Sequence, residues 1–288
     1  MYVDAGSPRR TRVYLETKAR EKGCRLIRTD HYLSPNLARN LGLRHVDSKY
    51  IVFIDNDVLV EPGWLDALVR CADETGAWLV GPLTLIGKPE HQILHVAGGV
   101  AHIREEQGKR IFHEEIPFRG RRLNELQMCL RREPSEVAEF HCMLARADLF
   151  ERLGPLDEQL LSVREHQDLC LTVLAAGGSV YFEPTAVVTF VPPPPLSWSD
   201  FPYFMLRWSE AWTLTSLRHF HEKWALDSVP DDLHLAWTRR RYLFLSQFHS
   251  LEILTRFIFG RPHPSWLKRR LLSLIERALT PLFVCNTS

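Results

Sequence analysis

Short apolar runs alternate with helical patterns along the first two-thirds of the chain. Residues 50–54, Tyr-Ile-Val-Phe-Ile, form the clearest apolar run and show no alternation of polar and apolar positions. Such a run is typical of a strand that is buried on both faces, as in a parallel sheet. Because helical patterns precede and follow it, the chain is predicted to have an α/β fold with a mainly parallel sheet flanked by helices.

Residues with strong start and stop preferences set the ends of the predicted elements. Ser7 is a good N-cap and Pro8 a good first-turn residue, whereas Gly154 and the glycine pair 177–178 end two later helices. The polar stretch 87–134 is less regular and is interrupted by glycines. The predicted helices are 8–22, 36–45, 62–73, 148–153 and 165–176, and the predicted strands are 24–28, 50–54, 77–81, 139–145, 180–182 and 186–190.

The last third of the chain has a different pattern, which begins after the proline run 192–195. Its pattern is helical, over residues 200–223, 231–259 and 264–279. The charge changes as well. The whole chain carries +1, but the residues from Ala236 onward include nine basic and two acidic side chains, or +7, which leaves −6 for the rest. We therefore expect an α/β domain at 1–196 and a basic helical appendage at 197–288.

The composition is that of a globular protein, with 288 residues of which 45% are hydrophobic and 25% charged. The balanced charge argues against nucleic acid as a partner. Six cysteines without a Cys-x-x-Cys pair predict reduced thiols, and neither a disulfide framework nor a zinc site. Apolar runs stay below the roughly 18–20 residues of a spanning helix, and the first residues do not resemble a signal peptide. We expect a cytoplasmic protein.

An Asp-Asn-Asp sequence directly follows the apolar run. Residues i and i+2 of a strand point to the same side, so Asp55 and Asp57 are expected to converge at the carboxyl end of this strand. In open parallel sheets ligands bind at that end, and two carboxylates there can hold Mg²⁺ or Mn²⁺ with its bound phosphate. The alternative, that the two side chains only cap and solubilise the strand end, is equally open from this motif alone.

Further motifs occur in a fixed order around the acidic pair. Residues 2–7 (Tyr-Val-Asp-Ala-Gly-Ser) and 36–42 (Asn-Leu-Ala-Arg-Asn-Leu-Gly) precede it, and residues 153–158 (Leu-Gly-Pro-Leu-Asp-Glu) and 165–171 (Glu-His-Gln-Asp-Leu-Cys-Leu) follow it. Together these segments resemble the inverting family 2 glycosyltransferases. The resemblance implies a GT-A fold for residues 1–196 and transfer of a sugar from a nucleotide-sugar donor to a hydroxyl acceptor.

The resemblance also implies roles for residues that bind the donor. Asp4, at the end of an Asp-x-Gly-Ser strand, would recognise the nucleotide base, and Arg39 and Asn56 would contact the nucleotide-sugar. Asp57, with Asp55 acting directly or through water, would hold Mn²⁺ or Mg²⁺, which neutralises the charge on the diphosphate leaving group. From the residues alone, a turn-forming Asp4 and a salt-bridged Arg39 on the helix surface are alternatives.

The catalytic base is expected at the start of the helix 165–176. The family has Glu-Asp-x-Asp here, so His166 stands where relatives place the base. A helix N-terminus favours an ionised carboxylate at Glu165 and disfavours a charged imidazole at His166, so either side chain could accept a proton. We place His166 slightly ahead of Glu165. Asp168 would orient either group, or would simply favour the helix dipole.

Two further departures from the family pattern concern the donor pocket. The family's first strand, which precedes the Asp-x-Gly-Ser strand, is absent before Tyr2, so we expect the sheet to lack a strand beside residues 2–4. Phe190 stands where many relatives have a metal-binding His. The missing strand and His166 keep a second function open, a degenerate glycosyltransferase that binds a glycan or a nucleotide without turnover.

Two other motifs are set aside. His91 and His95 have the spacing of a zinc-protease helix, but Gln92 stands where that chemistry requires Glu, so these histidines are expected to be structural or in a loop near the acceptor. Residues 51–58 also resemble the first motif of haloacid-dehalogenase-type phosphatases. That function is disfavoured because the paired acidic motif it needs occurs only at residues 231–232, which open a helix of the appendage.

The expected partners follow from this chemistry. The donor is a nucleotide-sugar, with UDP as the expected nucleotide, and the acceptor is a glycan or a lipid-linked molecule. The basic C-terminal helices, interleaved with Leu, Ile, Phe and Trp, would allow peripheral contact with an anionic membrane surface. The alternative is that the apolar faces of these helices pack on the core.

Overall fold

The computed structural model describes residues 1–126, 129–191 and 199–227. Its strands are β1 (Tyr2–Ala5), β2 (Leu26–Thr29), β3 (Tyr50–Ile54), β4 (Val58–Val60), β5 (Leu79–Ile86), β6 (Ile93–Val96), β7 (Val100–Glu106), β8 (Lys109–Glu115), β9 (Glu133–Ser135), β10 (Cys142–Arg146) and β11 (Val180–Phe190). Its helices are α1 (Arg9–Lys22), α2 (Pro35–Leu43), α3 (Trp64–Thr75), α4 (Asp148–Leu153), α5 (Glu165–Ala175), α6 (Phe201–Arg207) and α7 (Glu210–Lys223), with short 3₁₀ turns η1 (Pro89–His91) and η2 (Leu123–Glu125).

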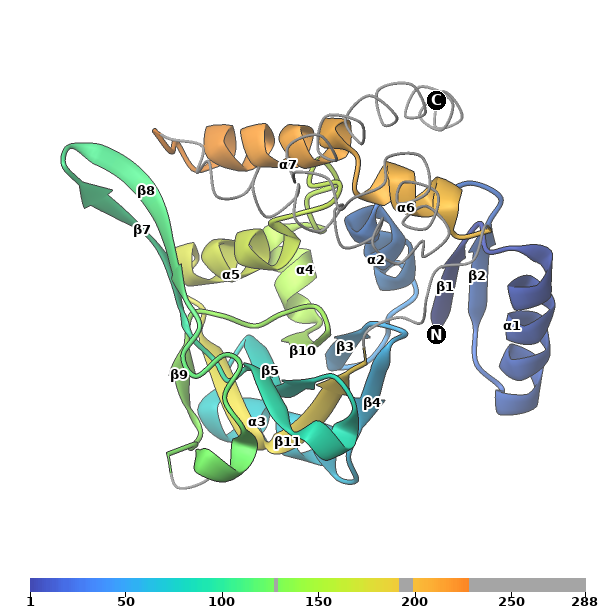
Figure 1. Cartoon of the computed structure of the whole chain (residues 1–288), viewed down its shortest axis with the longest axis horizontal. Helices are drawn as coiled ribbons and strands as arrows, with labels where there is room; N and C mark the ends of the chain where they lie inside the picture. Colours follow the sequence, from blue (N-terminus) through green and yellow to red (C-terminus); the bar gives the residue numbers. More distant parts are fainter. Residues whose placement is uncertain (127–128, 192–198, 228–288) are drawn as a thin grey trace, which may run out of the picture.

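A seven-stranded sheet forms the centre of the molecule (Figure 1). Its main path runs β3-β10-β5-β11-β4, with β6 paired to β5 and β9 paired to β11. Two smaller sheets accompany it, the pair β1-β2 and the hairpin β7-β8. Helices lie on both faces of the central sheet, so the predicted α/β class with a sheet flanked by helices is confirmed.

The expectation of a mainly parallel sheet is wrong in detail, because the sheet is mixed. β5 and β11 are parallel, and so are β1 and β2, but every other pairing is antiparallel. β3 and β5 run in the same direction, connected through α3, as a parallel crossover requires. β10 reaches the sheet much later in the chain and inserts between them in the opposite direction.

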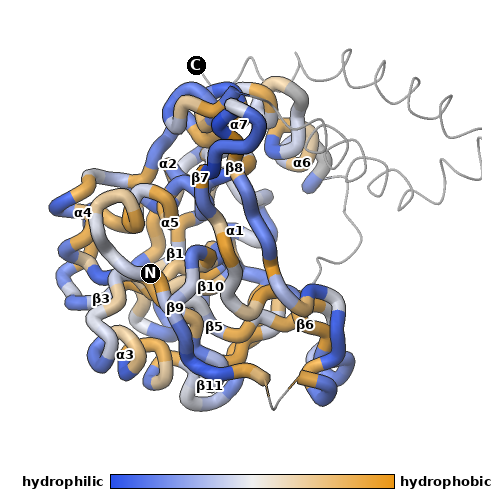
Figure 2. The backbone as a smooth tube through the Cα atoms, turned by 90° about the vertical axis from the view of Figure 1, so that its left-hand side faces the viewer, coloured by the Kyte–Doolittle hydropathy of each residue, from blue (hydrophilic) through white to orange (hydrophobic). Residues whose placement is uncertain are grey.

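Alternating side chains of the central strands build a core on each face of the sheet. On one face Leu79 and Met143 pack with residues of α4 and α5. On the other face the next residues, Val80 and Leu144, pack with α3. Figure 2 shows hydrophobic positions gathered around β5 and β10. The two cores fix β3 and β10 between helices and hold their ends in place.

Within the described residues the predicted helices and strands occur, with three differences. The run 50–54 is a strand but is not buried on both faces, since Ile54 is 44% exposed at its end. The two strands 180–182 and 186–190 are one strand, β11, whose register on β5 shifts between Glu183 and Val187. The helix predicted over 200–223 is two helices, because Ser209 caps α7 by accepting a hydrogen bond from the Trp212 N–H.

The expected missing strand would lie beside β1, so the pairing of β1 and of the edge strand β3 is relevant to it. Among the residues that the structure describes, β1 pairs only with β2, and β3 pairs only with β10. The pair β1-β2 is therefore not hydrogen-bonded to the central sheet. The expectation of a missing strand stays a prediction.

The C-terminal part is described only as far as residue 227. None of the helices in the described ranges is both long enough and apolar enough to cross a membrane. The predicted helices 231–259 and 264–279 and the basic segment from Ala236 lie outside the described residues. The boundary between residues 196 and 197 stays a prediction.

Candidate active site

The predicted acidic pair lies at the end of β3, where its two carboxylates come together. Each can offer an oxygen within 4.8 Å of the other and of a ring nitrogen of His141. Asp57 Oδ1 is buried and has no hydrogen-bond partner among the described residues. Burial raises the pKa of Asp57, and the nearby charge of Asp55 adds to this effect. Buried carboxylate oxygens without donors are suited to a cation, so these residues fit the divalent metal that the sequence predicts.

His141 comes to this site because of strand pairing. It directly precedes β10, and Cys142 lies opposite Ile54 of β3, so His141 comes next to Asp55. Its Nδ1 is 3.2 Å from Asp55 Oδ2, and its ring stacks on Phe190 with ring centres 4.3 Å apart. Burial by itself lowers the pKa of His141, but the hydrogen bond with Asp55 and the surrounding carboxylates raise it above its ordinary value.

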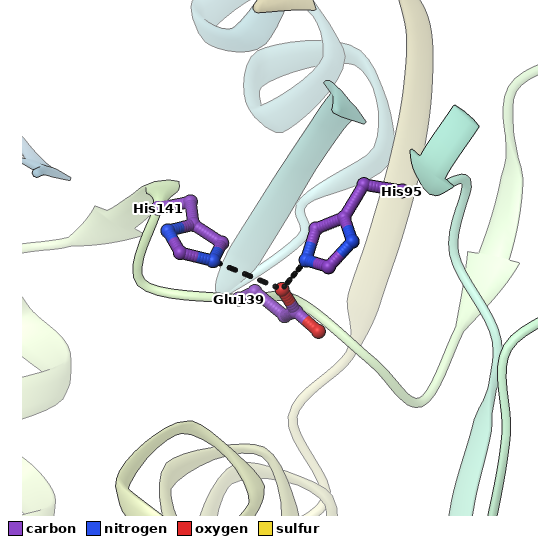
Figure 3. Close-up of side chains that lie close together, drawn as sticks. All are labelled: His95, Glu139 and His141. Atoms are coloured by element: carbon purple, nitrogen blue, oxygen red, sulfur yellow. Dashed lines mark ion pairs between the residues drawn. The ribbon is translucent and has the colours of Figure 1, made fainter. Parts of the chain in front are cut away.

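Glu139 lies between two histidine rings (Figure 3). Its Oε2 is 3.3 Å from His95 Nε2 and 3.7 Å from His141 Nε2, while its Oε1 accepts a hydrogen bond from Arg119 Nη2 at 3.0 Å. Burial opposes ionisation of Glu139, but the hydrogen bond with His95 and the charges of the nearby histidines, His166 among them, lower its pKa to about 2. Glu139 is therefore a fixed negative charge at neutral pH.

Arg39 lies on α2, and its guanidinium faces Asp55 of the acidic pair. Its Nη2 is 3.6 Å from Asp55 Oδ1, and its guanidinium lies 3.8 Å from the centre of the Phe140 ring. Burial lowers the pKa of Arg39, and the charges of Asp55 and Glu165 counter that effect. The side chain is 17% exposed, so Arg39 is part of the site and not a surface salt bridge.

Glu165 and His166 begin α5, as the sequence predicts. The residue before them, Arg164, has a φ of 72°, a left-handed conformation that is uncommon for a residue with a side chain. Glu165 Oε1 accepts a hydrogen bond from Arg207 Nη2 at 3.2 Å. His166 Nε2 is buried without a hydrogen-bond partner in the described part of the chain. Burial lowers the pKa of His166, which keeps its ring neutral at neutral pH.

Asp168 contacts α7 and the residue that follows it. One of its oxygens accepts a hydrogen bond from Lys223 Nζ at 2.8 Å, and the other accepts one from the Trp224 indole N–H at 2.8 Å. Burial raises the pKa of Asp168, and the two donors partly oppose that effect. These contacts connect α5 to α7, and an effect of Asp168 on the base stays a prediction.

Asp168→Ala is expected to lower the free energy of unfolding by about 1–3 kcal/mol, because it leaves the Trp224 indole N–H without its acceptor and leaves Lys223 with Asp157 as its remaining partner. Urea denaturation measures this change. Asp66→Ala is the matched control. Asp66 is an exposed acidic residue in the first turn of α3, so its substitution removes only the favourable interaction of the carboxylate with the helix dipole. Equal effects of the two substitutions would contradict the connecting role.

Asp4 and Asn56, the other predicted donor-binding residues, lie at the first strand and the acidic motif. Asp4 is buried; its Oδ1 accepts a hydrogen bond from the Ser7 N–H at 3.0 Å, and its Oδ2 is bound by Arg28. This is the turn-forming arrangement considered as the alternative. Asn56 is exposed and lies close enough to the Tyr2 side chain to lower the pKa of that phenol, which burial raises. Their contacts with a nucleotide stay predictions.

Sequence reasoning missed Glu139 and His141, and it set aside His95. His91 lies in η1 and His95 in β6, so the two do not share a helix and the rejected zinc-protease motif is absent from the structure. His95 instead faces Glu139. The only sequence signal for Glu139 and His141 is their place in the predicted strand 139–145, and that signal does not reveal which strand is their neighbour.

The comparisons with known proteins agree with this geometry. The family model described as "Glycosyl transferase family 2" matches residues 1–154, more than half of the chain. The chain belongs to glycosyl transferase family 2. The acidic pair and the Arg39 helix both lie within the matched residues, whereas Glu165 and His166 lie beyond them.

Two similar proteins place this family 2 chain among its relatives. The "Pre-mycofactocin glycosyltransferase" of Mycobacterium tuberculosis is 25% identical over 159 residues, which are 55% of this chain and 30% of that protein. The crystal structure of GalNAc-T7 with UDP, GalNAc and Mn²⁺ superposes with a TM-score of 0.50 at 15% identity, over 78% of this chain and 48% of that one. The chain thus spans about a third of the curated relative. The solved structure supports the GT-A fold.

Proposed function

We propose that this family 2 chain is an inverting glycosyltransferase. It moves a sugar from a nucleotide-sugar, with UDP as the expected nucleotide, to a hydroxyl group of a glycan or lipid-linked acceptor. The observation that carries the proposal is the acidic pair at the end of β3, with Asp57 Oδ1 buried and unpaired, beside Arg39 and near the start of α5. This combination supports a diphosphate site beside the acidic pair, with a base supplied from the start of α5.

Asp55 and Asp57 are the residues that would hold Mn²⁺ or Mg²⁺. When bound, such a cation neutralises the negative charge that develops on the diphosphate leaving group. Arg39 adds a fixed positive charge next to Asp55, where a guanidinium can also bind phosphate oxygens. Its contact with the Phe140 ring and its burial hold the guanidinium in one position.

His166 is the proposed base. Its neutral ring accepts the proton of the acceptor hydroxyl as the oxygen attacks the anomeric carbon from the face opposite the leaving group, which inverts that carbon. The unpaired, buried Nε2 is the atom for this role, because no other described group competes for its lone pair or proton. Glu165 is the alternative base, but its Oε1 already accepts a hydrogen bond from Arg207 Nη2 at 3.2 Å.

The relatives support the donor and the metal. The mycobacterial relative is named a glycosyltransferase, and the GalNAc-T7 structure contains UDP, GalNAc and Mn²⁺. We propose a cytoplasmic location, with peripheral membrane contact through the basic segment from Ala236. That segment is outside the described residues, so its +7 charge is the whole support for this contact.

A panel of nucleotide-sugars with Mn²⁺ is expected to contain a UDP-sugar that raises the melting temperature, since a ligand at 100 times its Kd stabilises by about 2.7 kcal/mol. Without an acceptor the same UDP-sugar should be hydrolysed slowly to free sugar, and with an acceptor its sugar should be transferred to form a glycoside. Mass spectrometry measures both products. Binding without any release would instead indicate the degenerate, non-catalytic protein. Phosphate release from a monoester would contradict both.

A further inference from the structure

His141 and the acidic pair have the spacing of ligands around a single ion. Its Nδ1 lies 3.2 Å from Asp55 Oδ2, and one atom each of His141, Asp55 and Asp57 lie within 4.8 Å of one another. Two ligands bound to one octahedral ion at about 2.1 Å lie about 3 Å apart when adjacent and about 4 Å apart when opposite. The three side chains can therefore converge on one cation.

We propose that His141 supplies, through Nδ1, a third protein ligand to the divalent cation of the Asp55–Asp57 site. The inference rests on the proposed function only in so far as that site is a metal site. A set of two carboxylates and one imidazole suits Mn²⁺ better than Mg²⁺, because imidazole binds transition metals whereas Mg²⁺ demands oxygen ligands and water. The protein is thus expected to prefer Mn²⁺.

The surroundings of His141 hold its ring in the orientation that metal binding needs. Phe190 stacks on one face of the ring at an interplanar angle of 22°. Glu139 Oε2 faces Nε2 at 3.7 Å on the edge of the ring away from Asp55 (Figure 3). A carboxylate on that edge favours the tautomer with the hydrogen on Nε2, so that Nδ1, which faces Asp55 in the metal-free chain, would give up its proton when a metal binds and offer its lone pair, the usual arrangement of a carboxylate, a histidine and a metal.

Asp57 gives an independent reason to place a cation here. A buried carboxylate oxygen normally has a hydrogen-bond donor, and Asp57 Oδ1 has none among the described residues. A cation between Asp57 and His141 provides the missing partner. It also separates the charges of Asp55 and Asp57, which otherwise repel each other.

A second group of potential ligands competes for the same histidine. His95, Glu139 and His141 also lie within 4.8 Å of one another. Glu139 is already engaged on both oxygens, by His95 and by Arg119, and neither contact needs an ion. We therefore assign the cation to the acidic pair and treat Glu139 as a positioning residue for His141.

The test measures Mn²⁺ binding directly, on the full-length protein, with and without UDP and in the absence of any sugar donor. Electron paramagnetic resonance of free Mn²⁺ gives the affinity. Electron spin echo modulation by ¹⁴N reports whether a ring nitrogen is bound to the Mn²⁺. The variants are His141→Ala, His141→Gln, Glu139→Gln and Asp57→Asn, with His95→Ala as the matched control, and the melting temperature of each metal-free protein checks that it folds.

The wild-type protein is expected to bind Mn²⁺, and the electron spin echo of the bound Mn²⁺ is expected to show modulation by ¹⁴N. Both His141 variants should lose the modulation and bind Mn²⁺ at least about tenfold more weakly. Glu139→Gln should weaken binding by about tenfold and keep the modulation, as substitution of a positioning residue does. His95→Ala should bind as wild type does.

Three results would overturn the inference: no Mn²⁺ binding by the wild-type protein, unchanged modulation in the His141 variants, or loss of binding in His95→Ala with binding retained in Asp57→Asn. The last result would place the ion between His95, Glu139 and His141. Because these measurements need no turnover, a protein that binds Mn²⁺ as proposed but transfers no sugar would contradict the proposed function alone.

Discussion

Asp57→Asn is expected to abolish metal-dependent sugar transfer while leaving the metal-free protein at least as stable as the wild type. The two effects have one cause. The Oδ1 atom of Asp57 is buried without a donor in the described part of the chain, and partial burial raises the pKa of the carboxyl group, so in the absence of a cation the ionised carboxylate disfavours the folded state. Above the raised pKa this cost is fully present, and the neutral Asn side chain removes it.

The loss of transfer should be on the order of 10³-fold or more, since a metal at a developing negative charge supplies several kcal/mol of stabilisation. EDTA should have the same effect on the wild-type protein, and Asp55→Ala should be nearly as severe. Initial rates of transfer and melting curves with and without Mn²⁺ measure both parts. Asp47→Asn, at an exposed position before β3, is the matched control. Full activity of the Asp57 variant in EDTA would rule out a metal role for this residue.

His166→Ala is expected to lower turnover by on the order of 10²–10⁴-fold while the donor still binds. The substitution removes the proton acceptor but leaves the acidic pair and Arg39 unchanged. Turnover is measured with donor and acceptor, and donor affinity by calorimetry with Mn²⁺ and the UDP-sugar. His166→Asp, which restores the residue that relatives have, should recover part of the activity.

The control for this prediction is His45→Ala, because His45 is exposed in the loop after α2. Glu165→Gln separates the two candidate bases. An active His166→Ala together with an inactive Glu165→Gln would transfer the role to Glu165, and the contact with Arg207 would then belong to the base.

Features that depend on neighbouring residues in the chain could be predicted from the sequence. The place of Asp55 and Asp57 at the carboxyl end of β3 could be predicted, because they directly follow the apolar run. The expected reason for their convergence is wrong, since residues 55–57 form the turn between β3 and β4 and the two-residue period of a strand does not apply there. Glu165 and His166 start a helix because the pattern of apolar residues after them is local. The α/β class of the fold follows from the alternation of short apolar runs with helical patterns, which is also local.

Features that depend on which strands become neighbours could not be predicted. His141 reaches Asp55 only because β10 inserts between β3 and β5, and no property of the residues before β10 specifies that pairing. The same insertion makes the sheet mixed. Similarly, the contacts of Arg207 with Glu165 and of Lys223 with Asp168 depend on where α6 and α7 pack, which helical periodicity does not determine.

The contacts of Asp168 set a practical limit on how far the protein can be shortened. A form that ends at residue 196, where the change of composition suggests a boundary, would lack Arg207, Lys223 and Trp224 together. Asp168 would then lose both of the side-chain donors that bind its carboxylate, and Glu165 would lose its cationic partner beside the proposed base. A form that ends at residue 227 retains all three donors. Crystallisation and library screening of a minimal enzyme should therefore begin from the longer fragment.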